Sequence, residues 1–184
     1  MKSYLITDPK YYKPLGDSLE DYLERVYQNH HIDYSCFRDK KNSNTKELAQ
    51  IFLLLCQKYK IQKTLINSDI ELAKELGFFG VHLTSKLLKN IKKAKEKNLF
   101  VIASTHTIKE VEFAIEQGVD AVTFSPIFET PNKGKPKGMK KLKELVLSQK
   151  VKIFALGGII TKKQIQKCQD VGAYGFASIR YFKT

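Results

Sequence analysis

Residues 151–160 read VKIFALGGII, a run of β-favouring residues that stops at two glycines just before a helical pattern. The apolar residues of this run indicate a buried strand, and Thr161 with Gln164 predicts the cap of the following helix. Glycines let a backbone approach a ligand closely, and free N–H groups at a helix start attract anions. The stretch therefore predicts a strand–loop–helix unit with a phosphate-binding loop at Gly157 and Gly158, although a plain tight turn fits the same residues.

The rest of the chain repeats this unit. Further strands are predicted at 4–7, 33–37, 64–67, 80–83, 99–103, 121–124 and 174–179; helices are predicted at 18–29, 45–59, 85–97 and 139–148, with three more that end at Gly77, Gly118 and Gly172. Alternating strands and helices build either a doubly wound sheet or a (β/α)8 TIM barrel, and eight units favour the barrel. We expect residues 1–184 to form one such compact α/β domain.

Little of the chain remains after the last predicted strand. Only residues 180–184 follow it, so the eighth helix is expected to be missing or a single turn. The apolar surface beside the first and last strands then needs another cover, and we expect a homodimer contact there.

The composition indicates a globular protein, with 42% hydrophobic and 28% charged residues. No apolar run has the length of a membrane span and no signal peptide is evident, so we expect a cytoplasmic protein with no membrane partner. Three widely spaced cysteines favour neither a disulfide framework nor a zinc site. The net charge of +13 comes from lysines spread along most helices without a nucleic-acid-binding motif. This pattern predicts solvated helix faces, with no nucleic-acid partner.

Ligands of TIM barrels bind where the carboxyl ends of the strands meet. The candidate residues at this rim, in chain order, are Arg38, Lys40, Asn67, Ser68, Ser85, Ser104, Thr130, Asn132, Lys133, Gly157, Gly158, Ile179 and Arg180. Phosphate sites in this fold lie after strands seven and eight, where Gly158 and Arg180 occur. Arg38, Lys40 and Lys133 could hold a second anionic group such as a diphosphate. The rim therefore predicts a small phosphorylated substrate.

The same segments carry a family resemblance. They read FRDK at 37–40, LINSDIELA at 65–73, GVHL at 80–83, STHTIKEV at 104–111, SPIFETPNK at 125–133, ALGGI at 155–159 and GAYGFASI at 172–179. In this order they resemble the thiamine-phosphate synthase family and its thiazole-tautomerase branch. In that family, hydroxymethylpyrimidine diphosphate loses pyrophosphate with the help of Mg²⁺, and a thiazole phosphate captures the resulting cation.

The resemblance implies roles for several of the rim positions. Arg38, Lys40, Asn67 and Lys133 would hold the diphosphate, and Ser104 would lie near the pyrimidine. A second group would hold the thiazole phosphate: Thr130, Asn132, and the backbone at Gly158 and Ile179. Arg38, Lys40, Lys133 and Ser104 are thus the expected catalytic residues, with Gly157 and Arg180 as further phosphate contacts.

Several positions depart from the family pattern. Cys36 stands where the family has a glutamine that recognises the pyrimidine. Ser68 and Leu87 stand at the two magnesium aspartates, and a hydroxyl and an alkyl group do not replace carboxylates for this cation. We therefore expect no metal ligand from the chain, with any Mg²⁺ held largely by the substrate. Asp69 is expected to cap its helix. Pro126 stands at the tautomerase histidine.

Three functions stay open at this point. We expect first a thiamine-phosphate synthase-like transferase of thiamine biosynthesis that binds hydroxymethylpyrimidine diphosphate and a thiazole phosphate, or thiamine phosphate, at the barrel mouth. The alternatives are a thiazole tautomerase-like enzyme without the usual histidine and a non-catalytic protein that binds a phosphorylated ligand.

Overall fold

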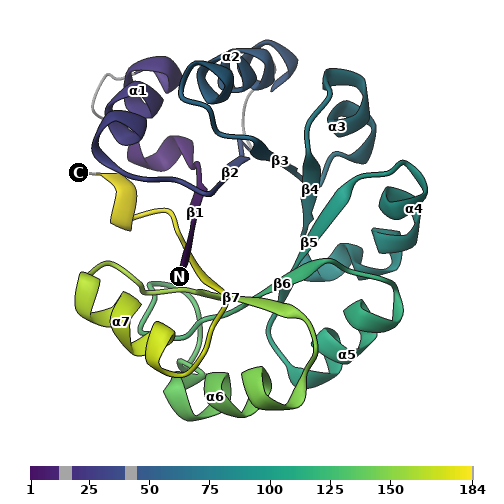
Figure 1. The fold of residues 1–184 in the computed structure, drawn as a ribbon, viewed down its shortest axis with the longest axis vertical. Helices are drawn as coiled ribbons and strands as arrows, with labels where there is room; N and C mark the ends of the chain where they lie inside the picture. Colours follow the sequence, from purple (N-terminus) through teal and green to yellow (C-terminus); the bar gives the residue numbers. More distant parts are fainter. Residues whose placement is uncertain (13–17, 40–44, 184) are drawn as a thin grey trace.

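Eight parallel strands form a closed barrel in chain order, with β1 pairing both β2 and β8 (Figure 1). The computed structural model describes residues 1–12, 18–39 and 45–183. The strands are β1 (Lys2–Ile6), β2 (Tyr34–Phe37), β3 (Lys63–Asn67), β4 (Gly80–Leu83), β5 (Phe100–Thr105), β6 (Ala121–Phe124), β7 (Lys152–Leu156) and β8 (Gly175–Ser178). The predicted (β/α)8 TIM barrel is confirmed.

Helices surround the barrel and cover the outer face of the strands (Figure 1). They are α1 (Leu19–Asn29), α2 (Thr45–Lys58), α3 (Ile70–Leu76), α4 (Ile91–Glu96), α5 (Ile108–Glu116), α6 (Gly138–Ser148) and α7 (Lys162–Asp170), with 3₁₀ turns η1 (Pro9–Tyr11), η3 (Ser85–Asn90) and η4 (Tyr181–Lys183). Capping boxes begin α1, α5 and α7 at Ser18, Thr107 and Thr161. The predicted cap at Thr161 is thus confirmed, because its side chain accepts from the N3 backbone N–H of Gln164.

One predicted helix is divided in two. The sequence predicts a continuous helix over residues 85–97, but the chain forms η3 first and α4 second, with Leu87 outside helical geometry at φ −112°. Leu88 of η3 and both Ile91 and Ala94 of α4 are buried, so both pieces pack against the barrel. Packing against the barrel therefore overrides local helix propensity here.

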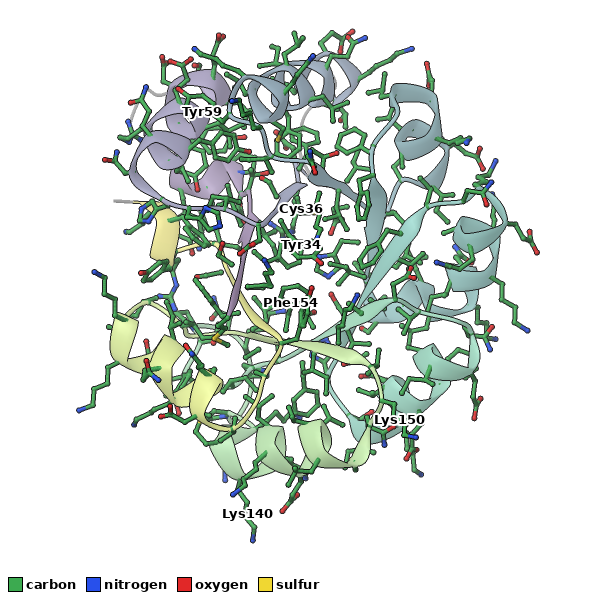
Figure 2. The ribbon with its side chains drawn as sticks, viewed as in Figure 1. Tyr34, Cys36, Tyr59, Lys140, Lys150 and Phe154 are labelled. Carbon is green, nitrogen blue, oxygen red and sulfur yellow. The ribbon has the colours of Figure 1, made fainter. Side chains whose placement is uncertain are left out.

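The apolar core has two layers. One lies inside the barrel and the other between the strands and the helices. Tyr34, Cys36 and Phe154 belong to the inner layer and lie inside the ring of strands in Figure 2, whereas Lys140 projects outward from α6. Gly175 makes room for the Phe154 ring, since a Cβ at Gly175 would lie 2.4 Å from Cε1 of that ring. The barrel interior is thus filled by side chains rather than open.

The C-terminal segment closes the gap between α7 and α1 (Figure 1). The single turn η4 replaces an eighth helix, as predicted. Phe182 is 1% exposed, and its ring stacks on Phe176 of β8 with centroids 5.7 Å apart. A groove of about 410 Å³ remains beside this turn, bordered by Ile165 and His30. The homodimer stays a prediction.

Two further features concern the cysteines and the helix lengths. Cys36, Cys56 and Cys168 are all buried and free. In the described ranges, no helix has the length and apolarity that crossing a membrane requires.

Candidate active site

The loop after β6 is hydrogen-bonded along the end of β7. The N–H of Ile127 donates to the carbonyl of Leu156 at 2.9 Å, and that of Phe128 donates to the carbonyl of Gly157 at 3.0 Å. Two loops that were expected to carry the site are therefore fixed to each other at the rim.

Gly157 and Gly158 have no space for side chains. A Cβ at Gly157 would lie 2.7 Å from Cα of Pro126, and a Cβ at Gly158 would lie 2.4 Å from the carbonyl oxygen of Glu129. Both glycines have positive φ, 95° and 71°, in the region that favours glycine. The neighbouring loop after β6 therefore requires glycine at both positions, whether or not a ligand binds there. The sequence did not reveal this contact.

The helix after the two glycines begins with its own cap. Oε1 of Gln164 accepts from the N–H groups of Ile160 at 2.9 Å and Thr161 at 3.1 Å. These two N–H groups, which directly precede α7, are therefore used by the cap and are not open to an anion. The N–H of Gly158 donates to no acceptor within residues 1–12, 18–39 and 45–183. The loop after β7 therefore keeps one unused backbone donor, the N–H of Gly158.

The loop after β8 lies against the loop that follows β7. Oγ of Ser178 donates to the carbonyl of Ile159 at 2.8 Å and accepts from the N–H of Tyr181 at 3.1 Å. Because β7 and β8 are neighbouring strands, Ile179 and Arg180 follow directly beside the two glycines. The predicted phosphate residues of strands seven and eight are thus brought together.

Thr130, Asn132 and Lys133 belong to the loop after β6. Oγ1 of Thr130 donates to the carbonyl of Phe128 at 2.9 Å and lies 3.3 Å from the position of a Cβ on Gly157. Asn132 and Lys133 are exposed, and Asn132 has a φ of 61°. Thr130 is therefore next to the two glycines, while the other two side chains lie at the open surface of the loop.

Arg38 is held at the rim by the first strand's loop. Nη1 of Arg38 pairs with Oδ2 of Asp8 at 2.5 Å, and its backbone N–H donates to Oγ1 of Thr7 at 2.8 Å. Both charged side chains are about four-fifths buried. The pairing of Asp8 with Arg38 was not predicted. Asp8 directly follows the first predicted strand, but the predicted rim residues began only after the second strand. Lys40 lies outside the described residues.

A cleft of about 490 Å³ opens beside the ends of β2 and β3. Asn67 and Ser68 line it together with Asp39, Asp69 and Lys93. Nδ2 of Asn67 donates to Oγ of Ser68 at 2.9 Å. Asn67 therefore faces the rim where it was expected, but its amide already has one partner.

A chain of polar side chains lies inside the barrel below the rim. The Tyr4 hydroxyl lies 2.7 Å from Nδ1 of His82, and Nε2 of His82 lies 2.9 Å from Oγ of Ser104. Burial, with a smaller contribution from the Arg38 charge, lowers the pKa of His82 to about 3. The imidazole is therefore neutral at physiological pH. Ser104 lies within β5 rather than after it, and half-buried. Tyr4 was predicted only as a strand residue.

Comparisons with known proteins agree with the resemblance seen in the sequence. The model of the thiamine monophosphate synthase family matches residues 3–182. The chain belongs to this family. "Putative thiamine-phosphate synthase 2" of Aquifex aeolicus is 33% identical over 184 residues, covering 97% of this chain and 96% of that protein. The thiamine-phosphate synthase of Fusobacterium nucleatum is 29% identical over 192 residues, with coverage of 97% and 87%.

A solved structure supports the fold. The thiamine phosphate pyrophosphorylase of Pyrococcus furiosus superposes with a TM-score of 0.84 at 22% identity, covering 99% of this chain and 90% of that one. The expected resemblance and the expected class, a thiamine-phosphate synthase-like transferase, are thus confirmed at the level of the family. The roles of the individual rim residues stay predictions.

The residues that the family resemblance would place at two magnesium positions, Ser68 and Leu87, do not suit that cation. Ser68 offers a hydroxyl that already accepts from Asn67, and Leu87 packs against the apolar core. The adjacent carboxylate, Asp69, accepts from the N–H of Leu72 as the cap of α3, as predicted. Mg²⁺ requires oxygen ligands in near-octahedral geometry. Across the described ranges, no three His, Cys, Asp or Glu side chains are grouped to hold a metal ion. Magnesium binding by the protein itself is therefore not supported by these donors.

Proposed function

We propose that this member of the thiamine monophosphate synthase family joins hydroxymethylpyrimidine diphosphate to a thiazole phosphate and releases pyrophosphate. The carbon–oxygen bond to the diphosphate breaks, with its electron pair leaving on pyrophosphate, and the thiazole nitrogen forms the new carbon–nitrogen bond. The observation that carries the proposal is the assembly of the loops after β6, β7 and β8 at one part of the rim, with Arg38 held on the other side of β1.

The thiazole phosphate binds where these three loops meet. The unused N–H of Gly158 and the positive charge of Arg180 offer a donor and a counter-charge to one phosphate group. Thr130 lies beside the two glycines and Ile179 follows β8, so backbone and hydroxyl donors can complete the contact. Such backbone donors suit phosphate oxygens.

The diphosphate binds toward Arg38. Asp8 holds the guanidinium in place, and a preorganised cation stabilises the negative charge that develops on departing pyrophosphate. Lys133 can approach from the exposed loop after β6, and Asn67 can offer its amide from the end of β3. Lys40 belongs to this set by family resemblance. The chemistry therefore rests on the chain's own cations.

The direct test is incubation of the purified protein with both substrates, with Mg²⁺ or with EDTA. We expect thiamine phosphate and pyrophosphate in equal amounts. Arg38→Gln is expected to lower kcat, and Arg180→Gln is expected to raise the KM for the thiazole phosphate. Arg25→Gln, on α1 away from the rim, is the matched control and is expected to leave both constants unchanged. Absence of product above background in both buffers would refute the synthase proposal.

A specific observation favours a second candidate, a non-catalytic binder of thiamine phosphate. By the family resemblance, the hydroxyl of Ser68 and the alkyl side chain of Leu87 stand where two magnesium aspartates are expected, and Leu87 packs against the apolar core. If the protein is such a binder, thiamine phosphate raises its melting temperature equally with Mg²⁺ and with EDTA, and the pyrimidine diphosphate has no effect. Stabilisation by the pyrimidine diphosphate would instead favour the synthase.

A further inference from the structure

The amino ends of four alternate strands carry an unusual layer of inward-facing residues. On these strands, the third residue belongs to the interior apolar cluster: Tyr4, Leu65, Ile102 and Phe154. Successive side chains of a strand point to opposite faces, so the first residue of each strand also points inward. These first residues are Lys2 of β1, Lys63 of β3, Phe100 of β5 and Lys152 of β7. They form one layer at the end of the barrel opposite the rim.

The lysines of this layer leave positive charge without compensation. Bulky apolar side chains dominate the interior of such barrels, whereas three of these four positions carry lysine. Lys2 pairs with Asp33, with Nζ 2.6 Å from Oδ1. Within residues 1–12, 18–39 and 45–183, no carboxylate lies within ion-pair distance of Lys63 or Lys152. Two like charges therefore lie at one opening without a counter-charge from the described chain.

Both uncompensated lysines lie against a pair of tyrosines. Nζ of Lys63 is 4.6 Å from the ring centre of Tyr34, and Nζ of Lys152 is 5.5 Å from the ring centre of Tyr174. The hydroxyl oxygens of Tyr34 and Tyr174 are 3.1 Å apart. Tyr34 lies inside the ring of strands (Figure 2). The two ammonium groups are thus gathered around one pair of hydroxyl groups.

The hydrogen bonds of this pair leave one donor unused. Nζ of Lys63 donates to the Tyr34 oxygen at 3.2 Å. Tyr34 is 1% exposed, so its own O–H is satisfied by donating to the Tyr174 oxygen. The O–H of the half-buried Tyr174 then has no acceptor in the part of the chain that the structure describes.

The Tyr174 hydroxyl keeps its proton near neutral pH. Burial raises the pKa of Tyr174 above its ordinary value, and the hydrogen bond to Tyr34 adds to that rise. Lys63 and Lys152 act in the opposite direction, because both ammonium groups lie near this hydroxyl, but the pKa stays raised. The opening therefore presents two ammonium groups and one O–H donor to a ligand.

We propose that Lys63, Lys152 and the Tyr174 hydroxyl form a phosphate-binding site at the amino-end opening of the barrel. This site is separate from the mouth and independent of the synthase proposal. A phosphate group carries close to two negative charges and several acceptor oxygens, which matches two uncompensated ammonium groups and a hydroxyl donor. A carboxylate would compensate only one of the two charges. The site takes the phosphate group of inorganic phosphate or of a small monoester.

The site is tested by NMR of protein with ¹³C-labelled tyrosine, in which the Tyr174 signal is identified by its loss in Tyr174→Phe. Inorganic phosphate replaces chloride at constant ionic strength, without any substrate. We expect the Tyr174 signal to shift and to saturate. Lys63→Gln and Lys152→Gln are each expected to weaken this binding about fivefold, because each removes a charged donor. Lys140→Gln is the matched control, since Lys140 projects outward from α6 (Figure 2) and should leave the affinity unchanged.

Two outcomes of this titration would overturn the proposal. A shift that does not saturate, or equal weakening in Lys140→Gln, would mean that phosphate only screens the general positive charge of the protein. Loss of the Tyr174 shift in Arg180→Gln would place the bound phosphate at the mouth instead. Thermal melting of each variant shows that it is folded.

Further titrations identify the ligand class. Acetate is expected to bind more weakly than phosphate, and equal affinity would overturn the assignment to phosphate. Glycerol phosphate tests the monoester: saturable binding shows that the phosphate group itself is recognised, whereas binding of inorganic phosphate alone identifies the free ion as the ligand. Failure of the synthase assay leaves all of these results unchanged, because none of them uses a substrate of the mouth.

Discussion

Single residues at the barrel mouth are positioned by close contacts with one or two neighbours. Gly158 touches the backbone of the neighbouring loop, and Arg38 is paired with Asp8. His82 uses both ring nitrogens. Each contact gives the residue a role in addition to any contact with substrate, and each can be tested by a substitution with a matched control.

Gly158→Ala is expected to destabilise the protein more than Gly118→Ala does. Both glycines have positive φ, so alanine costs about 1–2 kcal/mol of backbone strain at either position. A Cβ on Gly118 meets nothing within 4 Å, whereas one on Gly158 meets backbone atoms of Glu129 and Phe128. We expect about 1–3 kcal/mol of additional loss at Gly158, measured by urea unfolding. Equal losses would show that the two loops move apart freely.

Asp8→Asn is expected to strengthen binding of inorganic pyrophosphate about threefold at low salt. The change keeps an oxygen that can accept from Arg38 but removes a negative charge next to the proposed anion site. The gain should shrink at 0.5 M salt because screening weakens the interaction. Calorimetric titration measures both values. Asp170→Asn on α7 changes the net charge equally, and the same gain in that control would attribute the effect to the whole protein.

The stability of the protein is expected to fall as the pH is lowered from 6.5 toward 4.5. The pKa of His82 is about 3 in the folded state, mainly because of burial, against about 6.5 when unfolded. In this window the unfolded chain binds a proton that the folded chain does not, so the loss approaches about 1.4 kcal/mol per pH unit. Urea unfolding of the wild type and His82→Gln at several pH values measures it. Identical slopes would contradict the assignment.

At the residue scale, the sequence predicts which side chains reach the rim better than it predicts their partners. Gly158, Thr130 and Arg180 follow strand ends, and a parallel barrel brings strand ends together whatever their sequence distance. The contacts of Asp8 with Arg38 and of Tyr4 with His82 became apparent only with the fold, because they depend on side-chain directions in three dimensions. No local sequence pattern predicts contacts of this kind between residues far apart in the chain.

At the scale of elements, helix ends with side-chain caps were predictable and the irregular turn was not. Thr107 and Thr161 carry their signal within four residues of sequence. The break at Leu87 has no such signal, since neither Thr84 nor Asn90 caps through its side chain. The 3₁₀ geometry there results from packing on the barrel, which a local sequence window does not contain.

The turn η4 is expected to contribute strongly to stability despite its length. Phe182 is almost fully buried, stacked on Phe176 and edge-on to His30 at 5.5 Å. Phe182→Ala should lower the free energy of unfolding by about 3–5 kcal/mol, as for other buried aromatic residues. Leu147→Ala on α6 is the control, because Leu147 is 76% exposed and should cost little. Urea unfolding of both variants measures the difference, and equal losses would mean that η4 is dispensable.

At the scale of the whole molecule, the number of strand–helix repeats in the sequence predicted the barrel. Eight strands with seven intervening helices were predictable from hydrophobic periodicity and helix caps, and ring closure follows from pairing of β1 with β8. The homodimer predicted from the missing eighth helix is less directly implied by the fold, because Phe182 of η4 covers part of the surface beside the last strand.

The expected homodimer is tested by sedimentation velocity at micromolar concentration. We expect a species of twice the chain mass, formed through the groove beside η4, and Ile165→Lys at the edge of that groove should convert it to the monomer. Leu54→Lys is the control, because Leu54 is exposed on α2 away from the groove. A monomer in the wild-type protein would contradict the dimer, and dissociation by the control alone would place the contact on α2.

The Ser178 hydroxyl joins the C-terminal turn to the carbonyl of Ile159 at the rim. A fusion partner or affinity tag attached after that turn is therefore expected to disturb a hydrogen bond that also positions the loop of Gly157 and Gly158, the proposed phosphate site. Protein with a C-terminal tag should bind phosphorylated ligands more weakly than untagged protein, even when both melt at the same temperature.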